Sequence, residues 1–215
     1  QASGRLVATG RALGEDGVIN LTTSVDVPSG TLAGQRLTEA SFGFEGDLED
    51  GTLDGRLTGT AFLDGVRAEL AGDVLLDDEE RRLSGFRLSA GGAQASGDIT
   101  QDVASGLLDG TIRIAAPDIS TAAALFLVEA AGTVNADIVL TASEGRQDLA
   151  IDADLAAFRL DDTRVEQATL EATVADLFGV PAIEGTFAAR GADVAGTTIE
   201  TLDLSASSDG ETTDF

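Results

Sequence analysis

The feature that most constrains this chain is a period-two alternation of apolar and polar residues along most of its length. Apolar residues or glycine recur at every second position of residues 53–63, 66–76, 134–140 and 149–155, and Asp, Thr, Arg, Ser and Glu dominate between them. Neighbouring side chains of a strand point to opposite faces, so the alternation predicts antiparallel strands with one apolar and one polar face. The chain is therefore expected to be all-β.

One stretch departs from this alternation. Residues 119–131 follow Pro117-Asp118 and are rich in Ala and Leu, and Asp118 suits the N-cap of a helix. Four of its residues fall at helical spacing: Ala122, Leu125, Phe126 and Glu129. We therefore predict one short helix near 119–131.

An internal repeat is the most informative pattern in the chain. Four segments place apolar residues at successive steps of three, two and two. They are Leu37-Ala40-Phe42-Phe44, Leu83-Phe86-Leu88-Ala90, Val165-Ala168-Leu170-Ala172 and Ile199-Leu202-Leu204-Ala206. A second signature follows three of them: Leu53-Asp54-Gly55-Arg56-Leu57, Leu108-Asp109-Gly110-Thr111-Ile112 and Ile183-Glu184-Gly185-Thr186-Phe187. The step of three predicts a turn or β-bulge, and the irregular repeat spacing favours a long meandering sheet over a β-helix with a fixed coil.

The strand motif ending in Leu-x-Leu-x-Ala, as in residues 202–206, resembles the repeats of the TamB (translocation and assembly module) family. That family belongs with the AsmA-like, bridge-type lipid transfer proteins of Gram-negative envelopes. Residues 176–207, and 110–120 with the helical stretch after them, share the likeness, which covers most of the chain. The resemblance implies a long, curled, taco-like antiparallel sheet that forms an apolar groove.

The same resemblance implies a function, a location and partners. The chain would be a periplasmic segment of an inner-membrane-anchored protein, and its groove would shield phospholipid acyl chains in transit between the inner and outer membranes. The segment could equally assist outer-membrane protein assembly. The implied partners are acyl chains, neighbouring repeats of the parent protein and an outer-membrane barrel. Residues 1–206 are expected to form one continuous sheet within a longer protein, and the polar tail 207–215 to fray.

Composition excludes several other functions. Thirteen basic residues, all Arg, against 38 acidic ones give a net charge of −25, which argues against binding to nucleic acid or anionic membranes. Because the chain lacks His, Cys, Lys and Tyr, we expect no enzyme activity, no catalytic residues and no cofactor. The acidic clusters around Gly51 and at 77–80 lack calcium-loop spacing, so we expect solvated turns there and no metal site.

The apolar face is the candidate binding surface. It is rich in Ala, Gly, Leu and Val, and the chain has nine Phe but no Trp or Tyr, so this face would bind acyl chains by contact area alone. The predicted groove residues are Phe42, Phe44, Leu57, Leu70, Val74, Phe86, Leu88, Ile112, Ile114, Ile138, Leu140, Ile151, Leu170, Val174, Phe187, Leu202 and Leu204.

Three alternatives remain open from the sequence. The same face could be the closed core of two packed sheets. The chain could be a structural or adhesive β-repeat stalk or a secreted β-solenoid, stabilised by calcium. It could also be an acidic module that binds a cationic protein.

Overall fold

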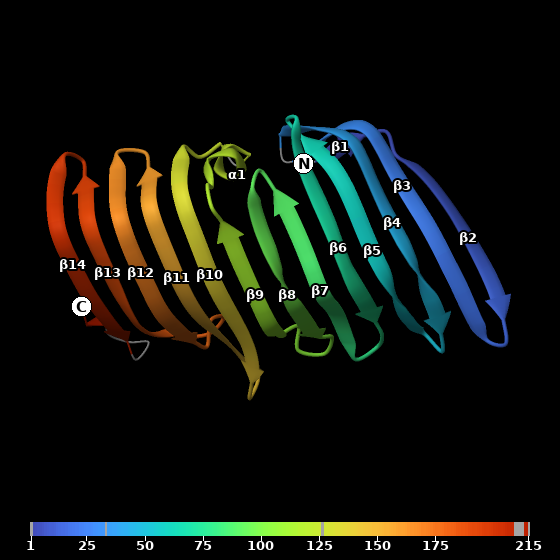
Figure 1. The fold of residues 1–215 in the computed structure, drawn as a ribbon. Helices are drawn as coiled ribbons and strands as arrows, with labels where there is room; N and C mark the ends of the chain where they lie inside the picture. The colour runs from blue at the N-terminus through green and yellow to red at the C-terminus, as the bar shows by residue number, and fades with distance from the viewer. Residues whose placement is uncertain (1, 33, 126, 209–212, 215) are drawn as a thin grey trace.

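The computed structural model describes residues 2–32, 34–125, 127–208 and 213–214, which form one long antiparallel sheet and a short helix (Figure 1). The strands are β1 Ala2–Gly4, β2 Val7–Glu15, β3 Val18–Leu32, β4 Gln35–Glu49, β5 Thr52–Leu63, β6 Val66–Leu76, β7 Glu80–Ala90, β8 Ala93–Asp102, β9 Leu108–Ala116, β10 Ala130–Ser143, β11 Arg146–Leu160, β12 Thr163–Ala175, β13 Ala182–Val194, β14 Thr197–Ser208 and β15 Thr213–Asp214, and helix α1 is Ser120–Ala124. From β3 onward each strand pairs with the next one in the chain, and β1 and β2 both pair with β3. The predicted all-β fold is confirmed.

Tight turns connect most neighbouring strands. At Asp50, Asp64 and Glu144 the backbone is left-handed, with φ values of 47°, 47° and 52°, and glycine follows each of them. This pairing is typical of the two-residue turns that match the twist of antiparallel strands. Connections after the even-numbered strands β2 to β12 lie along one long edge, here the lower rim, and those after β3 to β13 lie along the upper rim (Figure 1).

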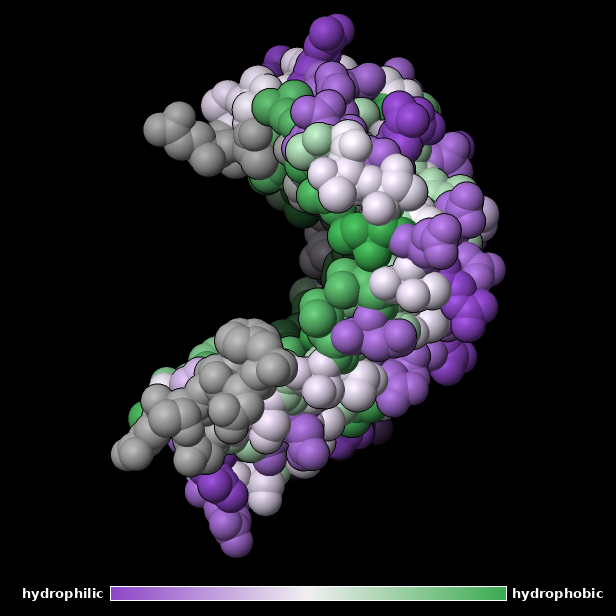
Figure 2. All heavy atoms as spheres, turned by 90° about the vertical axis from the view of Figure 1, so that its left-hand side faces the viewer, coloured by the Kyte–Doolittle hydropathy of each residue, from purple (hydrophilic) through white to green (hydrophobic). Residues whose placement is uncertain are grey.

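The sheet is curled along its strands into an open trough. Seen along its length in Figure 2, the molecule has the outline of a C, with hydrophobic residues inside the hollow and hydrophilic residues outside. The register shifts between Thr38 and Ser41 and between Leu83 and Phe86, so the step of three is a bulge in the first two repeats, as predicted. Such bulges bend a strand and increase its twist.

The last two repeats achieve the step of three differently. Their own residues keep φ negative, and the left-handed residue lies in the neighbouring strand, at Ala157 beside the Val165 repeat and at Gly191 beside the Ile199 repeat. At the step, both strands of each pair shift their alternation by one residue. The apolar residues on either side of the step therefore still point to the same face.

Helix α1 is shorter than the predicted range of 119–131. It ends after five residues because Leu127 has a left-handed backbone, with φ 58°, and the chain enters β10 at Ala130. The N-cap position is held by Ile119, not by Asp118, although the Asp118 carboxylate accepts the Ser120 N–H at 2.9 Å. That hydrogen bond lowers the pKa of Asp118. Phe126 lies outside the described residues.

The predicted tail is only partly described. Ser207 and Ser208 continue β14 and pair with Asp214 and Thr213 of β15, so these four residues are part of the sheet. The other tail positions, 209–212 and 215, lie outside the described residues.

A buried glutamine hydrogen-bonds to β9 where the backbone pairing of β9 with β10 has ended. Gln147 is 1% exposed, and its carboxamide pairs with the backbone of Leu108, accepting the N–H at 2.7 Å and donating to the carbonyl at 2.8 Å. The side chain thus takes the place of a strand backbone where the β9–β10 ladder has ended at Gly110 and Leu140. The alternation of apolar and polar residues did not predict that Gln147 is buried, because its burial depends on strands distant in the chain.

We expect Gln147→Ala to lower the free energy of unfolding by about 2 kcal/mol, because the Leu108 amide would lose its partner within a buried environment. Chemical denaturation followed by circular dichroism measures the loss. Gln94→Ala, on an exposed outer position of β8, is the control and should change stability little. Equal midpoints for the two variants would contradict the role given to Gln147.

Candidate functional site: the inner face of the trough

The inner face of the trough consists of rows of opposed residues that cross the sheet from β2 to β13 or β14. The first row is Ala8, Val25, Phe42, Gly59, Leu70, Leu88, Ala95, Ile114, Ala136, Ala153, Leu170, Phe187 and Leu204. Every member is apolar or glycine, and each pairs directly with the next. An uninterrupted apolar path therefore runs across thirteen strands.

Two further rows flank this path on its lower-rim side. The second row is Gly10, Thr23, Phe44, Leu57, Gly72, Phe86, Gly97, Ile112, Ile138, Ile151, Ala172, Gly185 and Ala206. The third row is Ala12, Leu21, Gly46, Gly55, Val74, Leu83, Ile99, Gly110, Leu140, Leu149, Val174 and Ile183. Across these three inner rows Thr23 is the one polar side chain, and none is charged.

All the predicted groove residues lie on this inner face. Sixteen of them belong to the three inner rows, and Leu202 lies beside the first row, opposite Ala189. Sequence reasoning left out Leu83, Ile99 and Leu149 of the third row, although they follow the same alternation. The strand register shows which residues they lie opposite.

No second layer covers the inner face in the described part of the chain. Phe42, Leu88 and Leu204 are 38%, 45% and 50% exposed, and the buried apolar residues are mostly alanines. The molecule exposes 13485 Å², whereas a compact monomer of 21.8 kDa exposes about 9,300 Å². The excess of accessible surface and the exposed inner side chains show that the face is an open groove and not a closed core, and an exposed apolar face is typical of an interaction site.

The outer face carries mostly polar and charged side chains. The outer row next to the first inner row is Thr9, Ser24, Gly43, Thr58, Ala71, Arg87, Ser96, Arg113, Asp137, Asp152, Glu171, Thr186 and Ser205. Asp137, Asp152 and Glu171 are consecutive there, which places like charges directly opposite each other. Only Asp137 of the three has an ion-pair partner among the described residues, Arg113 at 2.7 Å.

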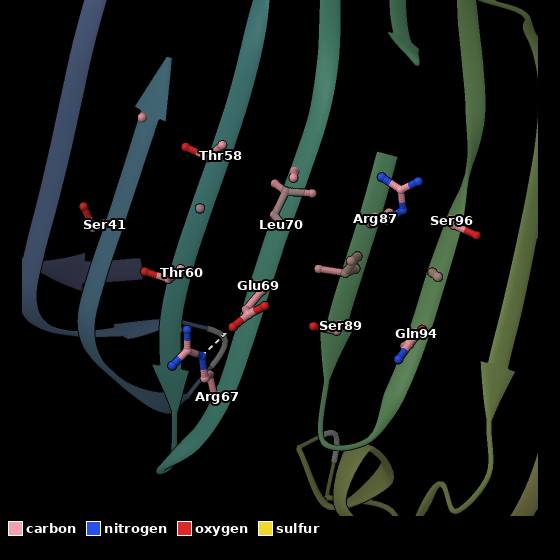
Figure 3. A pocket seen from close by; sticks show the side chains of 15 residues that line it. Ser41, Thr58, Thr60, Arg67, Glu69, Leu70, Arg87, Ser89, Gln94 and Ser96 are labelled. Atoms are coloured by element: carbon pink, nitrogen blue, oxygen red, sulfur yellow. Dashed lines mark hydrogen bonds and ion pairs between the residues drawn. The ribbon is translucent and has the colours of Figure 1, made fainter. Parts of the chain in front are cut away.

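A shallow hollow of about 690 Å³ lies on the outer face over β4 to β8. Short outer residues such as Ser41, Thr58 and Ser96 line it, and Figure 3 shows Arg67 and Glu69 joined at one side. Their ion pair, with Nε to Oε1 at 2.5 Å, is exposed and contributes little to stability. The hollow is shallow and lacks the converging polar groups of a small-molecule site.

The acidic turns form hydrogen bonds within the chain. Asp77 accepts the N–H groups of Glu80 and Glu79 at 2.7 and 2.8 Å, and these bonds lower its pKa. Asp102 accepts the hydroxyl and N–H of Ser105, and its pKa is lowered for the same reason. Among the residues that the structure describes, no cluster of three or more His, Cys, Asp or Glu could hold a metal ion.

We predict that millimolar calcium shifts the melting temperature by about 2 °C or less, and no more than magnesium does, because the carboxylates offer only nonspecific screening. Thermal melts with calcium, magnesium and EDTA measure this. A large rise specific to calcium would instead support a calcium-stabilised stalk.

Comparison with known proteins assigns no family: no protein-family model matches the chain, and neither a curated protein nor a solved structure matches it. In the described ranges no helix is long and apolar enough to span a membrane. The molecule's binding properties therefore have to be inferred from its own surface.

Proposed function

We propose that the inner face binds the acyl chains of phospholipids and shields them from water. On this proposal the chain is a periplasmic segment of a TamB-like, inner-membrane-anchored protein that carries phospholipid between the inner and outer membranes, or assists outer-membrane protein assembly. The observation that carries the proposal is the uncharged first inner row, which runs unbroken across β2 to β14 on an uncovered concave face. The sequence resemblance described above supports the same function.

The energetics are sufficient for lipid binding. A buried methylene contributes about 0.8 kcal/mol, so a sixteen-carbon chain that is half covered gains roughly 6 kcal/mol. Thirteen strands at about 4.8 Å spacing give a path of roughly 58 Å, about three times the length of one extended acyl chain. Several chains could therefore lie along the trough at once.

The path is also open at both ends. The first and second inner rows reach β2 and β14, and among the described residues β15 pairs with β14 at Ser207 and Ser208, beyond the first row, so a strand added beside Ala8 or Leu204 would extend that row. Such strands are what neighbouring repeats of a parent protein would supply, and an outer-membrane barrel partner would receive the lipid beyond them. A dry stalk or solenoid needs a covered core, which the exposed inner side chains do not provide.

Lipid loading tests the proposal directly. After incubation with phosphatidylcholine vesicles and re-isolation, native mass spectrometry should show bound phospholipid. A photoreactive residue at Ile138, in the second inner row, should then crosslink to lipid, whereas the same residue at Val139, which is 42% exposed and on the outer face, should not. A protein that carries no lipid after incubation, or crosslinks equally from both positions, would contradict the proposal.

A further inference from the structure

We infer that the trough accepts lipids whose head groups carry no net negative charge and discriminates against anionic lipids. This inference rests on the proposed function and adds a substrate class to it. The three inner rows have no charged side chain, so a lipid whose chains lie on them must leave its head group at the mouth, between the two rims. The charges of the rims therefore decide which head groups are tolerated.

The strand connections along both rims are acidic. The twelve connections that join β2 to β14 hold twelve carboxylates and no arginine. Those of the lower rim are Asp16, Asp50, Asp77, Asp78, Glu79, Glu144 and Asp176, and those of the upper rim are Asp64, Asp118, Glu129, Asp161 and Asp162. A head group at the mouth thus has carboxylates on both sides, and the arginines next to the upper-rim connections, Arg36, Arg67, Arg159 and Arg164, lie on outer-face positions.

Two of the three arginines closest to the lower rim form ion pairs. Arg82 forms an ion pair with Glu80, and Arg146 forms one with Glu144 at 3.4 Å. Arg81, whose side chain is on the inner side of β7, donates to Gln101 at 3.4 Å. The ion pairs make Arg82 and Arg146 less available for the bidentate contact that phosphate recognition uses, whereas the hydrogen bond of Arg81 to a neutral amide leaves its charge unpaired.

Turn geometry does not require this charge. Asp16, Asp50, Asp64 and Asp161 have left-handed backbones, a conformation in which asparagine serves as well as aspartate. Both asparagines of the chain, Asn20 and Asn135, lie in strands instead. The fold would tolerate neutral turns, so the acidic rims are a property beyond what the hairpins need.

The expected discrimination follows from screened electrostatics. In 0.15 M salt a charge is felt over about 8 Å, so the phosphate of a lipid at the mouth repels the nearest rim carboxylates. In a zwitterionic lipid the amine offsets that repulsion, and in an anionic lipid nothing does. The preference should therefore weaken as salt is added.

The test compares loading from vesicles of phosphatidylcholine and of phosphatidylglycerol with identical acyl chains, measured by native mass spectrometry. We expect phosphatidylcholine to load at least about fivefold more at 0.15 M salt, and the difference to shrink at 1 M salt. Equal loading, or a preference for phosphatidylglycerol, would overturn the inference and leave the proposed function standing. Loading of neither lipid would overturn both.

A matched pair of variants separates local rim charge from net charge. The rim variant combines Asp16→Asn, Asp50→Asn, Asp64→Asn and Asp161→Asn and should bring phosphatidylglycerol loading close to that of phosphatidylcholine. The control removes four charges from exposed outer-face positions: Asp152→Asn, Asp154→Asn, Glu171→Gln and Asp203→Asn. It should keep the original preference, and a control that relaxes selectivity as much as the rim variant does would refute the role of the rims.

Discussion

Replacing Leu170 with aspartate is expected to reduce phospholipid loading at least tenfold while the sheet stays folded. Leu170 lies in the middle of the first inner row between Ala153 and Phe187, so a charge there interrupts the apolar path. Because the trough is open, the carboxylate keeps contact with water and escapes the large cost of a buried, unpaired charge. Loading from phosphatidylcholine vesicles and the β-sheet circular dichroism spectrum measure the two outcomes.

The matched control lies one position away. Thr169 points to the outer face, so Thr169→Asp should load lipid normally. Leu204→Asp, at a first-row position that is 50% exposed, repeats the test with less risk to the fold. If either inner-face variant folds and still loads lipid as the unaltered protein does, acyl chains do not follow this path. If both aggregate, the face is a structural core and the lipid proposal fails.

Replacing Gly110 with alanine is expected to lower the free energy of unfolding by about 2–4 kcal/mol, a drop of roughly 5–10 °C in melting temperature. A Cβ at this position would collide with the Asp98 carbonyl of the adjacent strand, and the φ of 150° is one that alanine rarely adopts. Thermal melts measure the effect. Gly14→Ala in β2, where a Cβ has no atom within 4 Å, is the control, and equal losses for both would show that close approach is not the reason for Gly110.

The same close approach explains the second repeat signature. Its three glycines are Gly55, Gly110 and Gly185, and a Cβ on any of them would be too close to a carbonyl oxygen of the neighbouring strand. At Gly185 the distance to the Glu171 oxygen would be 2.7 Å. The sequence shows the recurrence of these glycines, but their reason is a contact between strands.

Several elements could be predicted because their causes are local. Alternation assigns each strand residue to a face, and the Asp-Gly pairs at 50–51 and 64–65, a dipeptide typical of two-residue hairpin turns, do form turns. The Asp109-Gly110 pair is inside β9, because a dipeptide alone does not separate a turn from a close strand contact. The predicted range of helix α1 was too long for a related reason: the end of the helix depends on where β10 begins to pair with its neighbours.

What the sequence determined by itself is therefore the chemistry of the two faces, apolar on one side and polar on the other, since side-chain parity depends only on neighbours in the chain. The tertiary structure decided whether the apolar face is covered. A closed sandwich and an open trough share the same alternation, and they differ only in whether distant strands pack over it. Here the strands stay in one curled layer, and the inner rows align through the strand register and the bulges. The buried Gln147 side chain hydrogen-bonds to β9 where the pairing of β9 with β10 ends. Those are relations between residues far apart in the chain, so alternation alone could not determine them.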